Sequence, residues 1–441
     1  MTGTDTSKRA LSVLFLVVMI DMIGFGIIIP FLTYFIEDLA TLEGLLEFGL
    51  WVGLMMSAYS AAQFLFSPFW GSLSDRVGRK PIIIAGLIGN SVFFTVFGMS
   101  TSLFMALIAR FLAGAFNANI AVAKAYIGDV SNHLNLAKRM GLIGAAFGLG
   151  FTIGPFLGGE FSRPADNWEL FSNTVFETHP YLLPCVIASM LSIVSFILAI
   201  RWLPESKKPN LSKTKTSLNP LKQINVMISD LRKVISMPKL GIMIAVSLFF
   251  TYGFTIMHAC FVLFTEWGLD FNEAENGRVF LIIGLNGILI QGILIGKLTK
   301  KFGSLNLMRY GTLICGIGLA TIPYVSTNWV WLTMAIVIIM ISTGNGLFQP
   351  SFMAILAQET RHQGYEMGVV MGTQESASAF ARIIGPFTGG VVWDFSINKS
   401  GLISHATAFH LCGLMLFIAF ILQFKIKVSM TDFGENVQEQ E

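Results

Sequence analysis

Twelve apolar runs, each about as long as a membrane-crossing helix, occupy most of this sequence. A transmembrane helix needs about 20 consecutive, mainly apolar residues to span the hydrocarbon core of a bilayer. Only 12% of the 441 residues are charged, compared with roughly 25% in soluble domains. The runs lie near residues 10–34, 49–70, 81–99, 103–128, 140–161, 181–202, 240–264, 279–298, 306–325, 329–356, 367–393 and 406–424. The sequence therefore predicts an all-α membrane protein with twelve transmembrane helices and both termini on the same side.

The distribution of Lys and Arg predicts which side that is. With the N-terminus inside the cell, about 23 of the 29 basic residues fall in cytoplasmic segments, as the positive-inside rule requires. The outer segments are acidic instead, as at Glu37, Asp38 and Glu273. The net charge of +3 therefore reflects membrane topology, and we expect a lipid bilayer around the chain and no nucleic-acid partner.

The run MGLIGAAFGLGFTIGPFLGG, residues 140–159, is unusual for a helix because it is rich in glycine and contains a proline. In the interior of a soluble helix, each glycine costs about 1 kcal/mol and a proline about 3 kcal/mol. In a membrane, small residues let helices approach closely, and a proline kink is tolerated. The composition therefore predicts a closely packed transmembrane helix.

The spacing of these small residues resembles the antiporter signature in the fifth helix of drug:proton antiporters of the Major Facilitator Superfamily. The residues that carry this resemblance are Gly141, Gly150, Gly154, Pro155, Gly158 and Gly159. A degenerate copy, MGTQESASAFARIIGPFTGG, lies at 371–390, so the chain contains an internal duplication. The resemblance implies the fold of that superfamily, with two six-helix pseudo-repeats.

The expected domains follow the duplication. They are residues 1–202 for an N-terminal six-helix bundle, 203–239 for a cytoplasmic linker, 240–425 for a C-terminal six-helix bundle and 426–441 for a cytoplasmic tail. In the linker, Asn219-Pro220 has the form of a helix start. The pattern after it predicts a basic amphipathic helix on the inner leaflet. The long outer loop at 162–180 either packs as a lid or is disordered.

The segment GSLSDRVGRKP, residues 71–81, resembles the superfamily's most diagnostic loop. An inner loop that is merely basic is the simpler alternative. The positions of Asp75 and of the two glycines, Gly71 and Gly78, within the motif argue against it. The resemblance implies a conformational latch in which Asp75 caps the start of the eleventh helix and Arg79 reaches the end of the fourth. The expected members of this latch are Gly71, Asp75, Arg76, Gly78, Arg79, Lys80 and Asp129. The corresponding segment of the second half has Lys300 in place of the acid, so we expect no second latch.

Ionisable residues within predicted spans are the candidates for proton coupling, because charges in a bilayer are costly and usually functional. We assign this role to Asp21, Arg110 and Glu375. Burial of Asp21 would favour its neutral form and a nearby cation its charged form, so the acid could load and release a proton. A structural ion pair is the alternative. Glu375 and Arg382 are seven residues apart, and we expect each to find its partner elsewhere.

The remaining polar residues of the predicted spans are candidates for lining a substrate cavity. They are Asn117, Lys124, Thr255, His258, Asn345, Gln349 and Arg382. Arg110, Asn117 and Lys124 share one helix face with small residues, and such a face cannot point at lipid. For Arg382, as for Glu375, cavity lining and structural pairing are both open.

The sequence contains no catalytic constellation, and we expect no enzyme activity, no metal site and no cofactor other than a proton gradient. The resemblance implies a proton-coupled exporter of a small amphipathic or drug-like molecule, similar to tetracycline-efflux or multidrug antiporters. We expect a monomer in the bacterial inner membrane that works by alternating access. Export of an endogenous metabolite or siderophore is an alternative, as is a proton-driven importer. A transport-inactive sensor or scaffold is the alternative from a different class.

Overall fold

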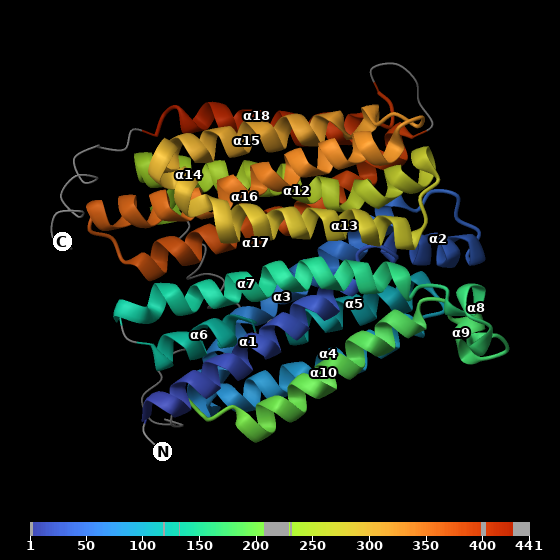
Figure 1. Ribbon diagram of the computed structural model, residues 1–441, viewed down its shortest axis with the longest axis horizontal. Helices are drawn as coiled ribbons and strands as arrows, with labels where there is room; N and C mark the ends of the chain where they lie inside the picture. Colours follow the sequence, from blue (N-terminus) through green and yellow to red (C-terminus); the bar gives the residue numbers. More distant parts are fainter. Residues whose placement is uncertain are drawn as a thin grey trace.

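The protein is a bundle of long helices that lie side by side (Figure 1). The computed structural model describes residues 3–117, 120–131, 133–206, 229, 232–397 and 403–426, and no strand occurs among them. The helices of the first half are α1 (Gly3–Ile27), α2 (Leu32–Leu42), α3 (Gly49–Val77), α4 (Arg79–Gly98), α5 (Leu103–Asn117), α6 (Ile120–Val130), α7 (His133–Glu160), α8 (Pro164–Asn167), η1 (Glu169–Phe171), α9 (Val175–Thr178) and α10 (Leu182–Trp202). Those of the second half are α12 (Pro238–Leu269), α13 (Glu273–Ile288), η2 (Leu289–Leu294), α14 (Ile295–Phe302), α15 (Ser304–Thr321), η3 (Ile322–Tyr324), α16 (Val330–His362), α17 (Met367–Ser396) and α18 (Thr407–Gln423).

Most of these helices are long and apolar enough to cross a bilayer. Within the described residues, eight spans qualify by length and hydropathy, and the bent pair α1–α2 makes a ninth. Helices α7 and α17 have 28 and 30 residues, so they also exceed the length that a bilayer requires. Together with the 17-residue α18, these segments correspond to the twelve predicted runs. The predicted all-α, multi-pass architecture is confirmed.

Two spans depart from a straight helix. The run predicted as one helix at 10–34 breaks after Ile27, and α2 leaves at an angle of 43°. Pro30 lies in this break, and its ring removes a backbone donor and disfavours a continuous helix. The eighth span instead contains η2, a six-residue π-helix between α13 and α14.

The helices form two groups, one from each half of the chain (Figure 1). In the N-terminal group, α1 packs against α7 and α10, and α5 packs against α3 and α4. In the C-terminal group, α12 packs against α17 and α18, and α16 packs against α13 and α15. The groups meet along two seams, α3 with α17 and α7 with α13. Most of the amphipathic helix predicted from Asn219 onward, and residues 427–441 of the tail, lie outside the described part of the chain.

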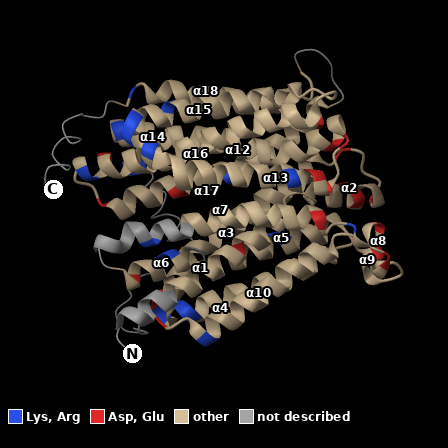
Figure 2. Ribbon diagram, viewed as in Figure 1, with Lys and Arg blue, Asp and Glu red and all other residues tan. Residues whose placement is uncertain are grey.

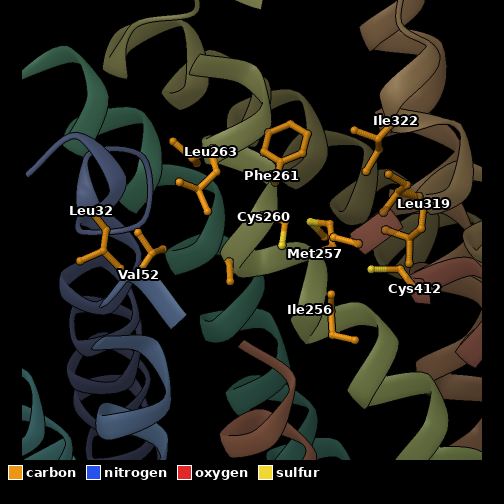
Figure 3. Close-up of a cluster of buried hydrophobic side chains, with 14 of the residues drawn as sticks. Leu32, Val52, Ile256, Met257, Cys260, Phe261, Leu263, Leu319, Ile322 and Cys412 are labelled. Atoms are coloured by element: carbon orange, nitrogen blue, oxygen red, sulfur yellow. The ribbon is translucent and has the colours of Figure 1, made fainter. Parts of the chain in front are cut away.

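The largest cluster of buried apolar side chains continues across both groups. In Figure 3, Phe261 of α12 lies between side chains of the N-terminal group and side chains of neighbouring C-terminal helices. The former include Leu32 and Val52, and the latter include Leu319 and Cys412. All four cysteines are buried and unpaired, so they act as small apolar packing residues.

Charged residues gather at the two ends of the bundle (Figure 2). Lys and Arg concentrate at the end where α1 begins and α18 finishes, whereas Asp and Glu dominate the other end, near α2 and the start of α13. The positive-inside rule predicts that the basic end is cytoplasmic. We call it the inner end and the acidic one the outer end.

The outer loop 162–180 is folded, which decides between the two alternatives left open by the sequence. It contains the short helices α8, η1 and α9. Its aromatic side chains form a chain of contacts, with ring centroids 5.8 Å apart for Phe161 and Trp168, and 5.2 Å apart for Phe171 and Phe176. The loop therefore packs on the outer end rather than remaining disordered.

Candidate transport pathway

Asp21 lies within the N-terminal group and is 2% exposed. Asn90 of α4 donates a long hydrogen bond of 3.4 Å to its carboxyl group. Among the described residues, no ion pair reaches Asp21. A buried carboxylate with so little compensation is unfavourable, which makes Asp21 a candidate functional group. Asn90 was missed by the sequence analysis because nothing in its own helix marks it.

Arg110 is a second buried charge, 3% exposed, on α5. Its guanidinium carbon lies 4.7 Å from the ring centroid of Tyr59 and 5.7 Å from that of Phe97. Among the described residues, its Nε and Nη1 atoms have no hydrogen-bond partner. Stacking on aromatic faces therefore provides much of what stabilises this cation.

Tyr59 of α3 connects these two buried groups. Asn117 donates a hydrogen bond to its hydroxyl group. On its other side, the ring of Phe25, one turn after Asp21, lies 5.0 Å from the Tyr59 ring. The structure thus brings the predicted residues Asp21, Arg110 and Asn117 around a tyrosine that the sequence analysis did not select.

Glu375 and Arg382 form an ion pair, and the prediction that each has its partner elsewhere is wrong. Arg382 Nη2 lies 2.8 Å from Glu375 Oε1. Seven residues of helix rise about 10.5 Å, too far for short side chains, but the long Arg and Glu side chains extend toward each other along the helix. Their side chains are 36% and 52% exposed, so the pair faces accessible space.

Lys124 on α6 belongs to the same charged region. It is exposed, and it interacts electrostatically with Glu375 from the opposite group of helices. The other predicted cavity residues differ in environment. Asn345 and Gln349 on α16 and His258 on α12 are partly exposed, and Asn345 Oδ1 has no hydrogen-bond partner. Thr255 is only 4% exposed and donates its hydroxyl to the Thr251 carbonyl oxygen at 2.8 Å, so it packs α12 rather than lining open space.

The predicted latch forms a compact polar cluster at the inner end. Arg79 pairs with Asp75 through Nη2 at 2.8 Å and with Asp129 through Nε at 2.9 Å, as predicted for Asp129. Its Nη1 donates to Ser74 Oγ at 2.5 Å. Glu205, which the sequence analysis missed, accepts the backbone N–H groups of Arg79 and Lys80 and so caps α4. Gly78 supplies the turn between α3 and α4 at φ 104°.

Glycines at the inner ends of α3 and α17 have open space beside them. Among the described residues, a Cβ atom placed at Gly71 of α3, or at Gly368 or Gly372 of α17, would meet nothing within 4 Å. The interaction between Asp75 and the start of α17 stays a prediction.

The outer half of α7 carries the tight packing expected of the glycine signature. A Cβ atom at Gly158 would lie 1.8 Å from the Ile27 carbonyl oxygen of α1, and one at Gly159 would lie 2.3 Å from the Glu273 carbonyl oxygen of α13. Gly144 and Gly148, nearer the middle of the same helix, have no described neighbour within 4 Å of an added Cβ atom. The outer part of α7 is thus closely packed against α1 and α13, while the space beside Gly144 and Gly148 is open.

A polar network joins the two groups at the outer end. Arg163 contacts Asp38 of α2 at 3.0 Å and Glu273 of α13 at 2.9 Å. The Tyr181 hydroxyl accepts a hydrogen bond from Arg163 and donates one of 3.0 Å to Glu273. The sequence signal for this network is slight: Arg163 is one of the few basic residues among acidic outer segments.

Two further links close the outer end. Tyr34 of α2 donates a hydrogen bond to the Phe271 carbonyl oxygen and accepts one of 2.8 Å from Asn276 of α13. Asp394 at the end of α17 accepts the backbone N–H groups of Gly49 and Leu50 at 2.8 and 2.7 Å. Each link joins the N-terminal group to the C-terminal group.

Comparison with known proteins agrees with this geometry. Residues 14–386 match the family model described as Major Facilitator Superfamily. A protein of Arabidopsis thaliana named "Probable peptide/nitrate transporter" is 28% identical over 416 residues, which cover 88% of this chain and 84% of that protein. The class B tetracycline resistance protein of Escherichia coli is 26% identical over 383 residues, which cover 86% and 88%. The crystal structure of the human organic anion transporter MFSD10 has a similar fold, with a TM-score of 0.67 at 21% identity and coverage of 95% and 99%.

Proposed function

This chain belongs to the Major Facilitator Superfamily, and on that premise we propose that it exports a small amphipathic or drug-like molecule in exchange for protons. It is a multi-pass membrane protein and a secondary transporter, not an enzyme. The observation that carries the proposal is the contrast between its two ends. The outer end is held closed by tight packing and polar links between the two groups, while glycines at the inner end face open space.

This contrast is what alternating access requires. In transporters built from two repeats, one group of helices rocks against the other about a site near the bilayer midplane. Here the seams α3–α17 and α7–α13 connect the groups, and Glu375, Arg382 and Lys124 are exposed between them. This arrangement supports an inward-facing state that admits substrate from the cytoplasm.

Asp21 is the proposed proton carrier. It is buried without a cation partner among the described residues, whereas Glu375 is paired with Arg382. In the proposed cycle, Asp21 is protonated from the outside as substrate leaves, and it releases the proton inside as the next substrate binds. Arg110 would assist release in a conformation that brings it close to the Asp21 carboxylate, because a nearby cation favours the charged form.

The exposed charges and the partly exposed Asn345 and Gln349 form the proposed substrate-binding region. A site with a few polar groups among apolar side chains would suit an amphipathic molecule. The similarity to a tetracycline resistance protein supports a drug-like substrate. An endogenous metabolite is the second candidate, favoured by the similarity to a protein whose name refers to peptide and nitrate. We further propose a monomer in a bacterial inner membrane, with both termini in the cytoplasm at the basic end.

Transport by inverted membrane vesicles tests the proposal. With an acid interior, vesicles containing the protein should accumulate tetracycline or ethidium. Asp21→Asn should abolish this uptake but retain binding of the probe, and Asp166→Asn, the same change at an exposed outer carboxylate, should leave uptake intact. Normal uptake by the Asp21→Asn variant would assign coupling to another acid, with Glu375 the next to test. No uptake and no proton release on addition of either probe would contradict drug export.

A further inference from the structure

An apolar pocket of about 510 Å³ lies between α3, α5 and α17, apart from the charged region described above. Ala58 and Ala61 of α3, Phe111 of α5 and Phe387 of α17 are among the residues that line it. Its volume is within the range of small-molecule sites, roughly 300–1,000 Å³. The pocket exists because the side chains of Ala58 and Ala61 are too small to fill the space between the three helices.

The pocket lies within the hydrocarbon region and opens on the membrane side. α3 begins at the outer end with Gly49, so Ala58 is about 13 Å along the helix at 1.5 Å per residue, in the outer half of a hydrocarbon core about 30 Å thick. At the rim, Ile108 and Phe387 are 44% and 43% exposed. Exposed apolar side chains at this depth contact lipid.

The lining has no polar group left to recognise a polar ligand. Its one hydroxyl group, that of Ser57, donates to the Ile383 carbonyl oxygen at 2.6 Å. An amphipathic substrate would need at least a few polar partners. If the apolar pocket were empty, the side chains that line it would lose dispersion contacts. In a bilayer, the molecules available to fill it are the hydrocarbon chains of the surrounding lipids.

The geometry points to a binding site for the acyl chain of an outer-leaflet phospholipid, and we propose that the bound chain favours the closed outer end. The second part rests on the alternating access proposed above. The walls belong to both groups of helices, α3 and α5 on one side and α17 on the other. The Ser57–Ile383 bond and the close approach of Gly53 to the Pro386 carbonyl oxygen lie on the same seam. Opening this seam would divide the pocket.

Photolabelling of the full-length protein in vesicles tests the site. Phosphatidylcholine with a diazirine in its acyl chain is the probe, and labelled residues are mapped by mass spectrometry. We expect label on the recessed residues Ala58 and Ala61, and loss of that label in the pocket-filling variant Ala61→Trp. Val194→Trp on α10, where Val194 is 47% exposed, is the matched control and should retain it. A diazirine fatty acid in a second arm shows whether the headgroup is needed.

The results that overturn the site are specific. Label confined to exposed residues outside the pocket, such as Val194 and Ile197 of α10, would exclude a lipid site. Label at Ala61 that excess ethidium displaces would also exclude it and would assign the pocket to substrate. Vesicle uptake is measured separately, so absence of label leaves the proposed transport function standing.

A separate measurement tests the proposal that the bound acyl chain favours the closed outer end. Leu46→Cys and Trp329→Cys place spin labels on exposed positions of the two groups, 97% and 69% exposed, while the native cysteines are buried. In detergent without lipid, addition of the phosphatidylcholine should shift the distance distribution toward the shorter, closed population. Ala61→Trp should do so without lipid. An unchanged distribution in both cases would overturn this part.

Discussion

Arg163 Nε lies 2.9 Å from Glu273 Oε1, which joins the loop after α7 to the start of α13 across the outer end. Because the same guanidinium group also contacts Asp38, one side chain connects three segments. Arg163→Gln should therefore weaken closure of the outer end. Since Arg163 is 36% exposed, we expect a modest change, about 1 kcal/mol or roughly a fivefold shift in the ratio of closed to open populations. Spin labels at Leu46→Cys and Trp329→Cys measure it. Arg278→Gln, which breaks the more exposed pair with Glu160, should have less effect, and equal effects would contradict the special role of Arg163.

Gly158 and Gly144 on α7 form a matched pair for testing the glycine signature. Gly158→Ala would place a Cβ atom 1.8 Å from the Ile27 carbonyl oxygen, and overpacking of this kind costs about 1–3 kcal/mol. Gly144→Ala meets no neighbour within 4 Å and should be neutral or stabilise the helix by up to about 1 kcal/mol. Thermal unfolding in detergent compares them. If Gly144→Ala also reduces vesicle uptake without loss of stability, the inner half of α7 packs only in another state of the cycle.

Arg79 should contribute more to stability than its partly exposed neighbour Lys80. Its side chain is 7% exposed and holds two carboxylates, so Arg79→Gln leaves both without this partner and should lower stability by about 2–3 kcal/mol. Lys80→Gln removes a bond between the ammonium group and the Ile200 carbonyl oxygen on the surface and should change stability by at most about 0.5 kcal/mol. If Arg79→Gln and Lys80→Gln lowered stability by similar amounts, the cluster around Arg79 would have no special structural role.

Arg382 should affect substrate handling rather than folding. The Glu375–Arg382 pair is 52% and 36% exposed, and exposed pairs contribute about 0–1 kcal/mol. Arg382→Gln should therefore leave the unfolding temperature nearly unchanged, while the KM for probe uptake changes because a charge in the proposed binding region is lost. A large loss of stability with an unchanged KM would make the pair structural.

His405 predicts a weak dependence of outer-end stability on pH. Burial beside Phe264 and Trp267, and then the neighbouring His410, lower the pKa of His405. The folded state therefore binds fewer protons at this site than the unfolded state, and the stability that His405 contributes above pH about 6.5 is lost as the pH falls. Thermal unfolding of the wild type should show this acid loss, and His405→Gln should reduce it.

The fold was predictable from sequence because a bilayer imposes a length and a composition on each span. The apolar runs therefore located the helices, and the glycine spacing located a tightly packed one. The break at Pro30 and the extension of the first span to Leu42 were missed, since the acidic pair Glu37-Asp38 interrupts the apolar residues of 32–42. The π-helix was not predictable because its residues are as apolar as the α-helix around them.

The candidate site was predictable only where one helix or one loop carries it. The Arg79–Asp129 pair followed from a resemblance, and intramembrane charges such as Asp21 and Arg110 stood out individually. The residues around Asp21 and Arg110 could not be predicted, because Tyr59 and Asn90 lie on other helices. The outer network was missed for the same reason, since Asp38, Arg163 and Glu273 are more than 100 residues apart in sequence. The prediction for Glu375 and Arg382 was wrong because the usual rule for side-chain pairs on a helix considers residues three or four apart. These two long side chains meet although they are seven residues apart.

The π-helix at Leu289–Leu294 gives the eighth span a joint. Residues before it pack on α7 at the outer seam, while α14 beyond it makes its contacts with α15 and α16. A π-helical turn is rare inside an α-helix and often marks a functional position. We therefore propose that the inner third of this helix bends at the π-helix while its outer part stays docked on α7, so that gating involves flexing of one helix as well as tilting of an entire half.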